Sequence, residues 1–367
     1  MRTELQETLL KLVRLGIRTE SVSSAMFVVP DSIDWEALQI LATEQGLSAI
    51  VVDGLEKLPV EQKPPKLVLL QWIGEVLQQE SQYAIQEKAA GDMALIFKNN
   101  AIRTYVLKGA VVAECYPNPI HRSSSDLDCF LVPDKSDFNA WELGNDLIKA
   151  NGFEVESVFY KNSTFFLPEL MVENHRFLTP FRGNGRLKQL ERWFQSQFKS
   201  LRIQEVQEGL RFEGTWLYRP PVLVSALFLI EHAYSHFLHE GLTWRHVLDW
   251  MMFSRKHESE IDWNELTVFV DEFGFRKFYD SYERLGRYLL GEIKEEVLTK
   301  KDKMMLADVW APLDLHESDH GLKGKLALAG NTWRARWKYR YFAEISMVKA
   351  LWIQVKGVLF IKNPTLD

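Results

Sequence analysis

Apolar residues recur three and four positions apart through most of the first hundred residues. This spacing places them on one face of a helix. It predicts helices over residues 5–17, 33–46 and 67–100. Asp31 and Ser32 precede the second of these segments and are residue types that cap the start of a helix. We therefore expect residues 1–100 to form a helical segment that leads directly into a strand.

Between residues 101 and 219 the pattern changes to short apolar runs and to alternation of apolar and polar residues. Such patterns are typical of β-strands. The predicted strands cover residues 104–107, 126–132, 153–160, 164–167, 169–181, 201–206 and 210–218. A turn at Lys108 and Gly109 and a short helix over 110–115 join the first two strands, and a helix over 136–151 follows them.

Two consecutive prolines, Pro220 and Pro221, follow the last predicted strand and indicate a domain boundary. Helical periodicity dominates from there almost to the C-terminus. The sequence therefore predicts an α+β protein with three parts. These are an N-terminal helical segment (residues 1–100), an α/β core with a mixed sheet (101–219) and a C-terminal all-helical domain (220–367).

Composition and charge narrow the class of protein. The chain has 367 residues, of which 46% are hydrophobic and 26% charged, as in ordinary globular proteins. Its formal net charge of −6 argues against general nucleic-acid binding, which usually needs a basic surface. Two cysteines suggest neither a disulfide framework nor a cysteine zinc site. Because the chain has neither a signal-peptide core at its start nor a run of about 18 apolar residues, we predict a cytoplasmic, bacterial-type protein without a membrane partner.

The strongest chemical signal is the pair Asp126 and Asp128 on the second predicted strand. Side chains two apart share a face, so both carboxylates point one way while the apolar residues between and after them point into a core. Two carboxylates on one face repel each other unless a cation lies between them, and Mg²⁺ is typically bound by one or two carboxylates together with substrate phosphates. Gly109 opens a short helix whose N–H groups can bind phosphate, and Lys108 adds a positive charge beside it.

The segments Leu107–Gly109, Tyr116–Pro117 and Asp126–Asp128, with Arg122 between them, resemble the uncharacterised nucleotidyltransferases of the DNA polymerase β-like superfamily. Most members of that superfamily have Gly-Ser or Gly-Gly at the turn, whereas the subfamily that this chain resembles has Lys-Gly. The resemblance implies a nucleotidyltransferase-like mixed sheet with flanking helices. It also implies transfer of a nucleotidyl group from a nucleoside triphosphate such as ATP to an acceptor, which could be a small molecule, a protein or an RNA end.

The resemblance further implies which residues form the site. Asp126, Asp128 and Glu173 would hold Mg²⁺ or Mn²⁺, with Glu173 as a third ligand or a general base. His175 would lie beside them, because the family has an acidic residue two positions before a histidine on this strand. The residues expected to contact the nucleotide are Lys108, Gly109, Arg122, His175 and Arg245.

A later helix with His232, His236 and His239 is followed by a helix with Arg245 and Asp249, as in the resembled family. Arg245 either pairs with Asp249, four residues later, and braces the two helices, or faces the nucleotide pocket. The spacing of the three histidines also suits zinc and leaves a zinc-dependent hydrolase open as an alternative function. Histidines at a packing interface are the more ordinary interpretation.

Two further alternatives stay open. The chain could keep the nucleotidyltransferase fold as a non-catalytic binding or regulatory module, and Glu173 could be a solvent-facing strand residue. Aromatic and basic residues alternate from Trp333 to Tyr341 and could bind single-stranded nucleic acid. Packing of an amphipathic helix explains that segment more simply.

Overall fold

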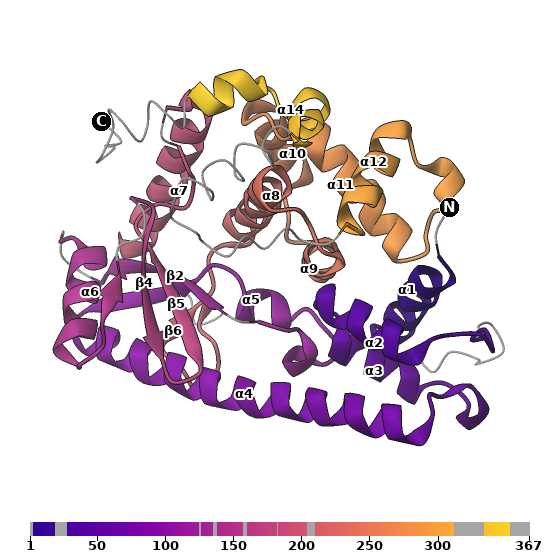
Figure 1. The fold of residues 1–367 in the computed structure, drawn as a ribbon. Coiled ribbons are helices and arrows are strands. Elements are labelled where there is room, and N and C mark those ends of the chain that lie inside the picture. The colour runs from indigo at the N-terminus through magenta and orange to yellow at the C-terminus, as the bar shows by residue number, and fades with distance from the viewer. Residues whose placement is uncertain are drawn as a thin grey trace, which may run out of the picture.

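The structure is a computed structural model of the chain. It describes residues 3–18, 28–124, 126–134, 138–156, 160–181, 183–203, 210–311 and 334–352. A β-sheet with packed helices lies at one end of the molecule and three short N-terminal helices lie at the other (Figure 1). The long helix α4 (Lys66–Asn99) runs along both. This arrangement is the mixed α+β fold that the sequence predicts.

The N-terminal part is helical, as predicted. Its elements are α1 (Glu4–Gly16), α2 (Trp35–Glu44), α3 (Ser48–Glu56), the 3₁₀ helix η2 (Val60–Gln62) and α4. The predicted cap of α2 at Asp31 or Ser32 is wrong. Asp34 caps this helix, because its carboxylate accepts a hydrogen bond from the backbone N–H of Ala37 at 3.0 Å.

Six strands form one mixed sheet in the order β3-β4-β5-β2-β1-β6. They are β1 (Ile102–Val106), β2 (Asp126–Pro133), β3 (Val155–Glu156), β4 (Asn162–Leu167), β5 (Leu170–His175) and β6 (Leu217–Tyr218). The central strands β2 and β5 are parallel, and in their register Asp128 lies beside Glu173. Because partners in register point to the same face of a sheet, this pairing brings two of the predicted carboxylates together.

Helices cover both faces of the sheet. On one face α6 (Ala140–Ala150) approaches so closely that a Cβ added at Gly144 would lie 2.2 Å from the Leu131 side chain. On the other face Phe198 of α7 (Gly185–Ile203) packs against Tyr105 and Phe130, with ring centroids 5.3 and 4.5 Å away. Phe130 follows Asp128 by two residues, so this second face also carries the aspartate pair.

Helix α7 corrects a prediction made from the sequence. Residues 201–203 form the end of this helix and not the start of a strand. Within α7 the buried apolar side chains Leu190, Phe194, Phe198 and Leu201 recur at helical spacing. Burial of this stripe outweighs the weak strand preference of the last three residues. Parts of the predicted strands and helices lie outside the described residues, at 136–137, 157–159 and 204–206, and so do residues 1–2, 19–27, 312–333 and 353–367 of the predicted helical parts.

The C-terminal part is helical where it is described, as predicted. Its elements are α8 (Val222–His239), α9 (Trp244–Lys256), α10 (Trp263–Glu272), α11 (Arg276–Leu289), η5 (Glu295–Val297), α12 (Lys300–Val309) and α14 (Arg336–Phe342). In α14 the buried Lys338 pairs with Asp308 at 2.8 Å, and Trp337 packs edge-on against Phe342. The described part of the aromatic and basic segment thus packs as an amphipathic helix. None of the helices in the described ranges is long and apolar enough to span a membrane.

His121, in the 3₁₀ helix η3 (Pro119–His121), ties the loop before β2 to the N-terminal helices. Its Nδ1 lies 2.8 Å from Asp53 Oδ2 and its Nε2 lies 2.8 Å from Glu80 Oε1, so both ring nitrogens face carboxylates. Burial lowers the pKa of His121, but its hydrogen bonds to Asp53 and Glu80 outweigh that effect and raise the pKa above 6.5.

We expect His121→Gln to destabilise the protein more at about pH 5.5 than at about pH 8.5. An imidazolium held by two carboxylates stabilises the folded state fully below the pKa of the unfolded chain. This contribution is lost as the pH rises through the higher pKa of the folded state. Urea unfolding of both proteins across this range measures the difference, and an equal loss of stability at both ends would contradict the prediction.

Candidate active site

The predicted carboxylates meet on the face of the sheet formed by β2 and β5. His175 Nε2 lies 2.9 Å from Asp128 Oδ1 and 3.5 Å from Glu173 Oε2. The potential ligand atoms of these three residues all lie within 4.8 Å of one another, and they are the one such group of three among the described residues. The structure therefore gathers Asp128, Glu173 and His175 into a set that could hold a metal ion.

Lys108 connects Asp126 to this set. Its Nζ lies 2.9 Å from Asp128 Oδ2 and 3.4 Å from Asp126 Oδ2. A third neighbour is His232 Nε2 on α8, at 3.1 Å. The cation between the two aspartates in this structure is thus the ammonium group of Lys108, which the sequence analysis expected at the phosphates.

Gly109 makes this position of Lys108 possible. Its φ of +64° lies in the left-handed region, which a residue with a Cβ rarely adopts. The helix that follows, α5 (Ala110–Ala113), has four residues and is shorter than predicted. A helix this short has little macrodipole to offer a phosphate, so the turn serves chiefly to aim Lys108 at the aspartates.

The charges of the site stabilise one another. Burial would raise the pKa of Asp128, but Lys108 and His175 outweigh it and hold that pKa well below its ordinary value. The hydrogen bond from His175 likewise lowers the pKa of Glu173. Burial and the nearby ammonium keep the pKa of His232 well below 6.5, so its imidazole is neutral and accepts a hydrogen bond from Lys108. Asp128 and Glu173 are therefore ionised at neutral pH.

Arg122 is buried and forms an ion pair with Asp249 of α9. Its Nε and Nη2 donate to the Asp249 carboxylate at 3.1 and 2.6 Å, and Tyr116 donates to the same group at 2.7 Å. Arg122 is 2% exposed, and its Nη1 has no hydrogen-bond partner among the described residues. The partners of Arg122 could not be found from the sequence, because Asp249 lies 127 positions away.

Arg245 does not form the helical pair with Asp249 that its spacing suggested. Asp249 is held by Arg122 instead, and Arg245 Nη1 donates to the backbone carbonyl of Ser123 at 2.8 Å. This contact attaches α9 to the loop that leads into β2. In the structure Arg245 therefore braces that loop.

The three histidines proposed for zinc do not converge. Among the residues that the structure describes, they form no group of three ligands at metal-binding distance. His232 contacts Lys108, His236 Nδ1 lies 2.8 Å from Glu240 Oε2, and the ring of His239 bonds to the backbone carbonyl of Ser235. Each histidine thus has a separate local partner.

A mixed sheet with acidic residues on adjacent central strands and a Lys-Gly turn beside them has the features of a nucleotidyltransferase-like fold. Residues 31–291 match the model of a protein family described as an uncharacterised nucleotidyltransferase. The match covers most of the chain and includes Lys108, the aspartate pair and the Glu173 strand, so the chain belongs to this family. Comparisons with curated proteins and with solved structures found no match.

Proposed function

We propose that this protein transfers a nucleotidyl group from a nucleoside triphosphate to a hydroxyl-bearing acceptor, in a reaction that requires Mg²⁺ or Mn²⁺. The observation that carries the proposal is the position of Asp128, which shares the Lys108 ammonium with Asp126 and also lies in a set of potential metal ligands with Glu173 and His175. Membership in a nucleotidyltransferase family supports the same reaction class.

The residues at this position fit a divalent cation. Asp128 Oδ2 is buried, and its one close partner among the described residues is the Lys108 ammonium at 2.9 Å, a cation whose place a metal ion could take. The ring nitrogen Nδ1 of His175 lies 3.3 Å from the Phe177 carbonyl and can donate there, so Nε2 would become a metal ligand on losing the proton that it now donates to the carboxylates. The side chains of Asp126 and Glu173 are 20% and 31% exposed, so the site is open to solvent on one side.

A bound divalent cation would polarise the triphosphate and lower the pKa of the attacking hydroxyl. The chain itself positions and neutralises charge, as is usual for phosphoryl-type transfer. The acceptor oxygen forms a bond to the α-phosphorus while the bond to the bridging oxygen breaks and pyrophosphate leaves. Glu173, the most exposed of the three carboxylates, accepts the proton of the hydroxyl. Lys108, displaced from between the aspartates, contacts a phosphate oxygen.

The proposal is tested by a thermal-shift panel of ATP, GTP, CTP and UTP, each with Mg²⁺, Mn²⁺ or EDTA. A ligand that binds only the folded state raises the melting temperature. We expect at least one nucleotide to raise it by a few degrees with metal and not with EDTA. The Asp126→Asn/Asp128→Asn double variant should lose this shift. A protein that melts cooperatively and responds to no nucleotide would favour the non-catalytic binding or regulatory module.

We expect Lys108→Met to bind Mn²⁺ more tightly than the wild type. Without the ammonium, the carboxylates of Asp126 and Asp128 face each other with no cation between them, and a divalent cation can bind there without first displacing a side chain. The variant should melt at a lower temperature in EDTA and show a larger increase on addition of Mn²⁺. Equal increases in the two proteins would mean that Lys108 and the metal occupy separate positions.

A further inference from the structure

The middle of α4 contributes no fully buried residue to the core. Its buried residues are Trp72 and Val76 near the start and Ala90, Met93, Ala94 and Phe97 near the end. Residues 77–89 include none, although the helix continues through them between the N-terminal helices and the sheet. A polar, only partly buried stretch in the middle of a packed helix indicates a surface that serves something other than the core.

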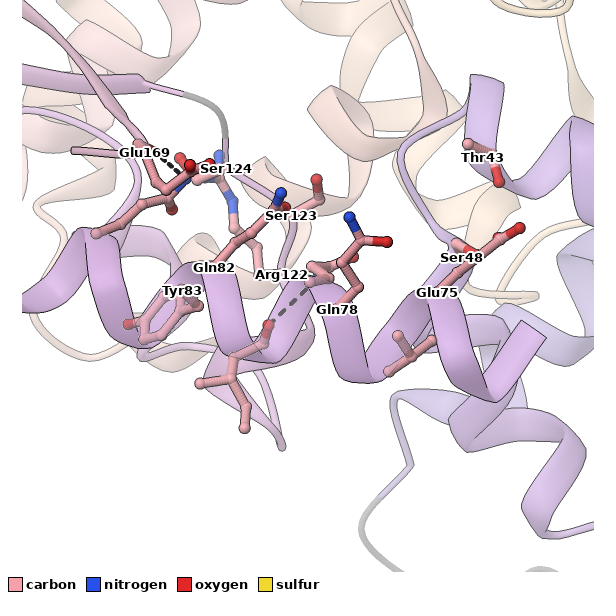
Figure 2. A pocket seen from close by; sticks show the side chains of 14 residues that line it. Thr43, Ser48, Glu75, Gln78, Gln82, Tyr83, Arg122, Ser123, Ser124 and Glu169 are labelled. Atoms are coloured by element: carbon pink, nitrogen blue, oxygen red, sulfur yellow. Dashed lines mark hydrogen bonds between the residues drawn. The ribbon is translucent and has the colours of Figure 1, made fainter. Parts of the chain in front are cut away.

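This stretch forms one wall of a cavity of about 540 Å³. The side chains along it extend from Glu169 and Ser124 at one end to Thr43 and Ser48 at the other (Figure 2). The α4 residues that line it are mainly glutamines and fall into two rows with a spacing of four. The rows are Gln78, Gln82 and Gln86, and Glu75, Gln79 and Tyr83. Residues four apart lie on one face of a helix, so three turns present amide groups to the same space.

Several hydrogen-bonding groups in the cavity lining have no partner within the described part of the chain. The buried one is the Nη1 of Arg122, a residue that is 98% buried and lines the cavity, whereas the side-chain amides of Gln78 and Gln82 lie at exposed positions. Arg122 is held in place by Asp249, so Nη1 is a fixed donor. A buried donor without a partner costs free energy, which a bound ligand would recover.

The cavity borders the loop that leads into the strand of the aspartate pair. Ser123 and Ser124 form its wall on the loop that leads into β2, and Ser124 Oγ donates to the Asp126 backbone carbonyl at 3.0 Å. Arg245 holds the same loop through the carbonyl of Ser123. A ligand in the cavity would therefore lie beside the residues that carry the aspartate pair.

The charge and size of the cavity restrict its ligand. Glu75 and Glu169 line it, and the only positive group in its lining, Arg122, is already neutralised by Asp249. The resulting negative charge of the cavity lining disfavours the binding of anions such as phosphates. Glutamine amides both donate and accept, as vicinal hydroxyl groups do, and Tyr83 adds an aromatic face. The volume is in the range of sites for small molecules.

We infer that this cavity binds the acceptor of the proposed transfer, and that the acceptor is a small, uncharged polyhydroxylated molecule resembling a sugar or cyclitol. This inference rests on the proposed function for the role of the ligand as acceptor. Binding of the ligand does not depend on the nucleotide and can be measured without it.

Saturation-transfer NMR of the full chain with a defined mixture tests the inference. The mixture contains glucose and myo-inositol as uncharged polyols and glucose 6-phosphate and citrate as anions. We expect saturation transfer to the polyols and little to the anions. Gln82→Trp fills the cavity from an exposed helix position and should reduce the polyol signal about tenfold. Gln71→Trp places the same residue on α4 outside the cavity lining and should leave the signal unchanged.

The outcomes separate this inference from the proposed function. No signal from either polyol, signals from the anions alone, or equal polyol signals in the two tryptophan variants would overturn the inference. Titration of Mg²⁺ with the nucleotide chosen by the thermal-shift panel completes the test. If the wild type and both tryptophan variants bind none of the four nucleotides with Mg²⁺, while only Gln82→Trp loses the polyol signal, the transferase reaction is rejected and the cavity is kept as a polyol site.

Discussion

Replacing Glu173 by glutamine is expected to lower turnover by about 100-fold to 10,000-fold, the range lost when a general base is removed. Glutamine has nearly the same size as glutamate, but its amide is neutral. It therefore cannot accept the hydroxyl proton and cannot bind a cation through a negative charge. Asp128 and Lys108 remain, so binding of the nucleotide should weaken much less than turnover. Pyrophosphate release measures turnover, with a dialysed and an undialysed cell extract as the two sources of acceptor.

The control for this variant is Glu156→Gln, on the exposed strand β3 of the same sheet. This substitution also removes one negative charge, but at a position outside the candidate site, and should leave turnover unchanged. Turnover retained in Glu173→Gln would contradict its role as base and support the interpretation of Glu173 as a solvent-facing strand residue. A parallel loss of nucleotide binding and turnover would instead favour a role as metal ligand alone.

Removing the Asp249 carboxylate is expected to have the largest effect on stability. Asp249→Ala leaves the guanidinium of Arg122, which is 2% exposed, as a buried charge without its partner. Loss of one member of a buried ion pair costs about 3–5 kcal/mol. Tyr116 loses its acceptor at the same time. The free energy of unfolding from urea denaturation, compared with the wild type at neutral pH, measures the effect.

An exposed ion pair provides the comparison. Lys88 and Asp92 lie 2.7 Å apart on the surface of α4, and Asp92→Ala should change the free energy of unfolding by no more than about 0.5 kcal/mol. A similarly small change for Asp249→Ala would show that Arg122 reaches solvent or another partner when the carboxylate is absent. The difference between the two variants isolates the contribution of burial, since both remove an aspartate from an ion pair.

The parts of the predicted geometry that the structure confirms depend on neighbouring residues. Asp126 and Asp128 share a face because strand side chains alternate with a period of two, and the same rule places Glu173 beside His175. The helices before residue 100 and after residue 220 follow from a spacing that local backbone geometry determines. The α7 helix was missed for a related reason: three residues at its end were interpreted without the apolar stripe that precedes them.

What the amino-acid sequence by itself determined is therefore the α+β class, the family resemblance and the pair of carboxylates on one strand. Only the tertiary structure decided that Lys108 occupies the space between those carboxylates, that Asp249 neutralises Arg122, and that the glutamines of α4 line a cavity. The physical reason is that periodicity is a property of adjacent residues, whereas the neutralisation of a buried charge depends on which distant groups folding brings within a few ångströms of it.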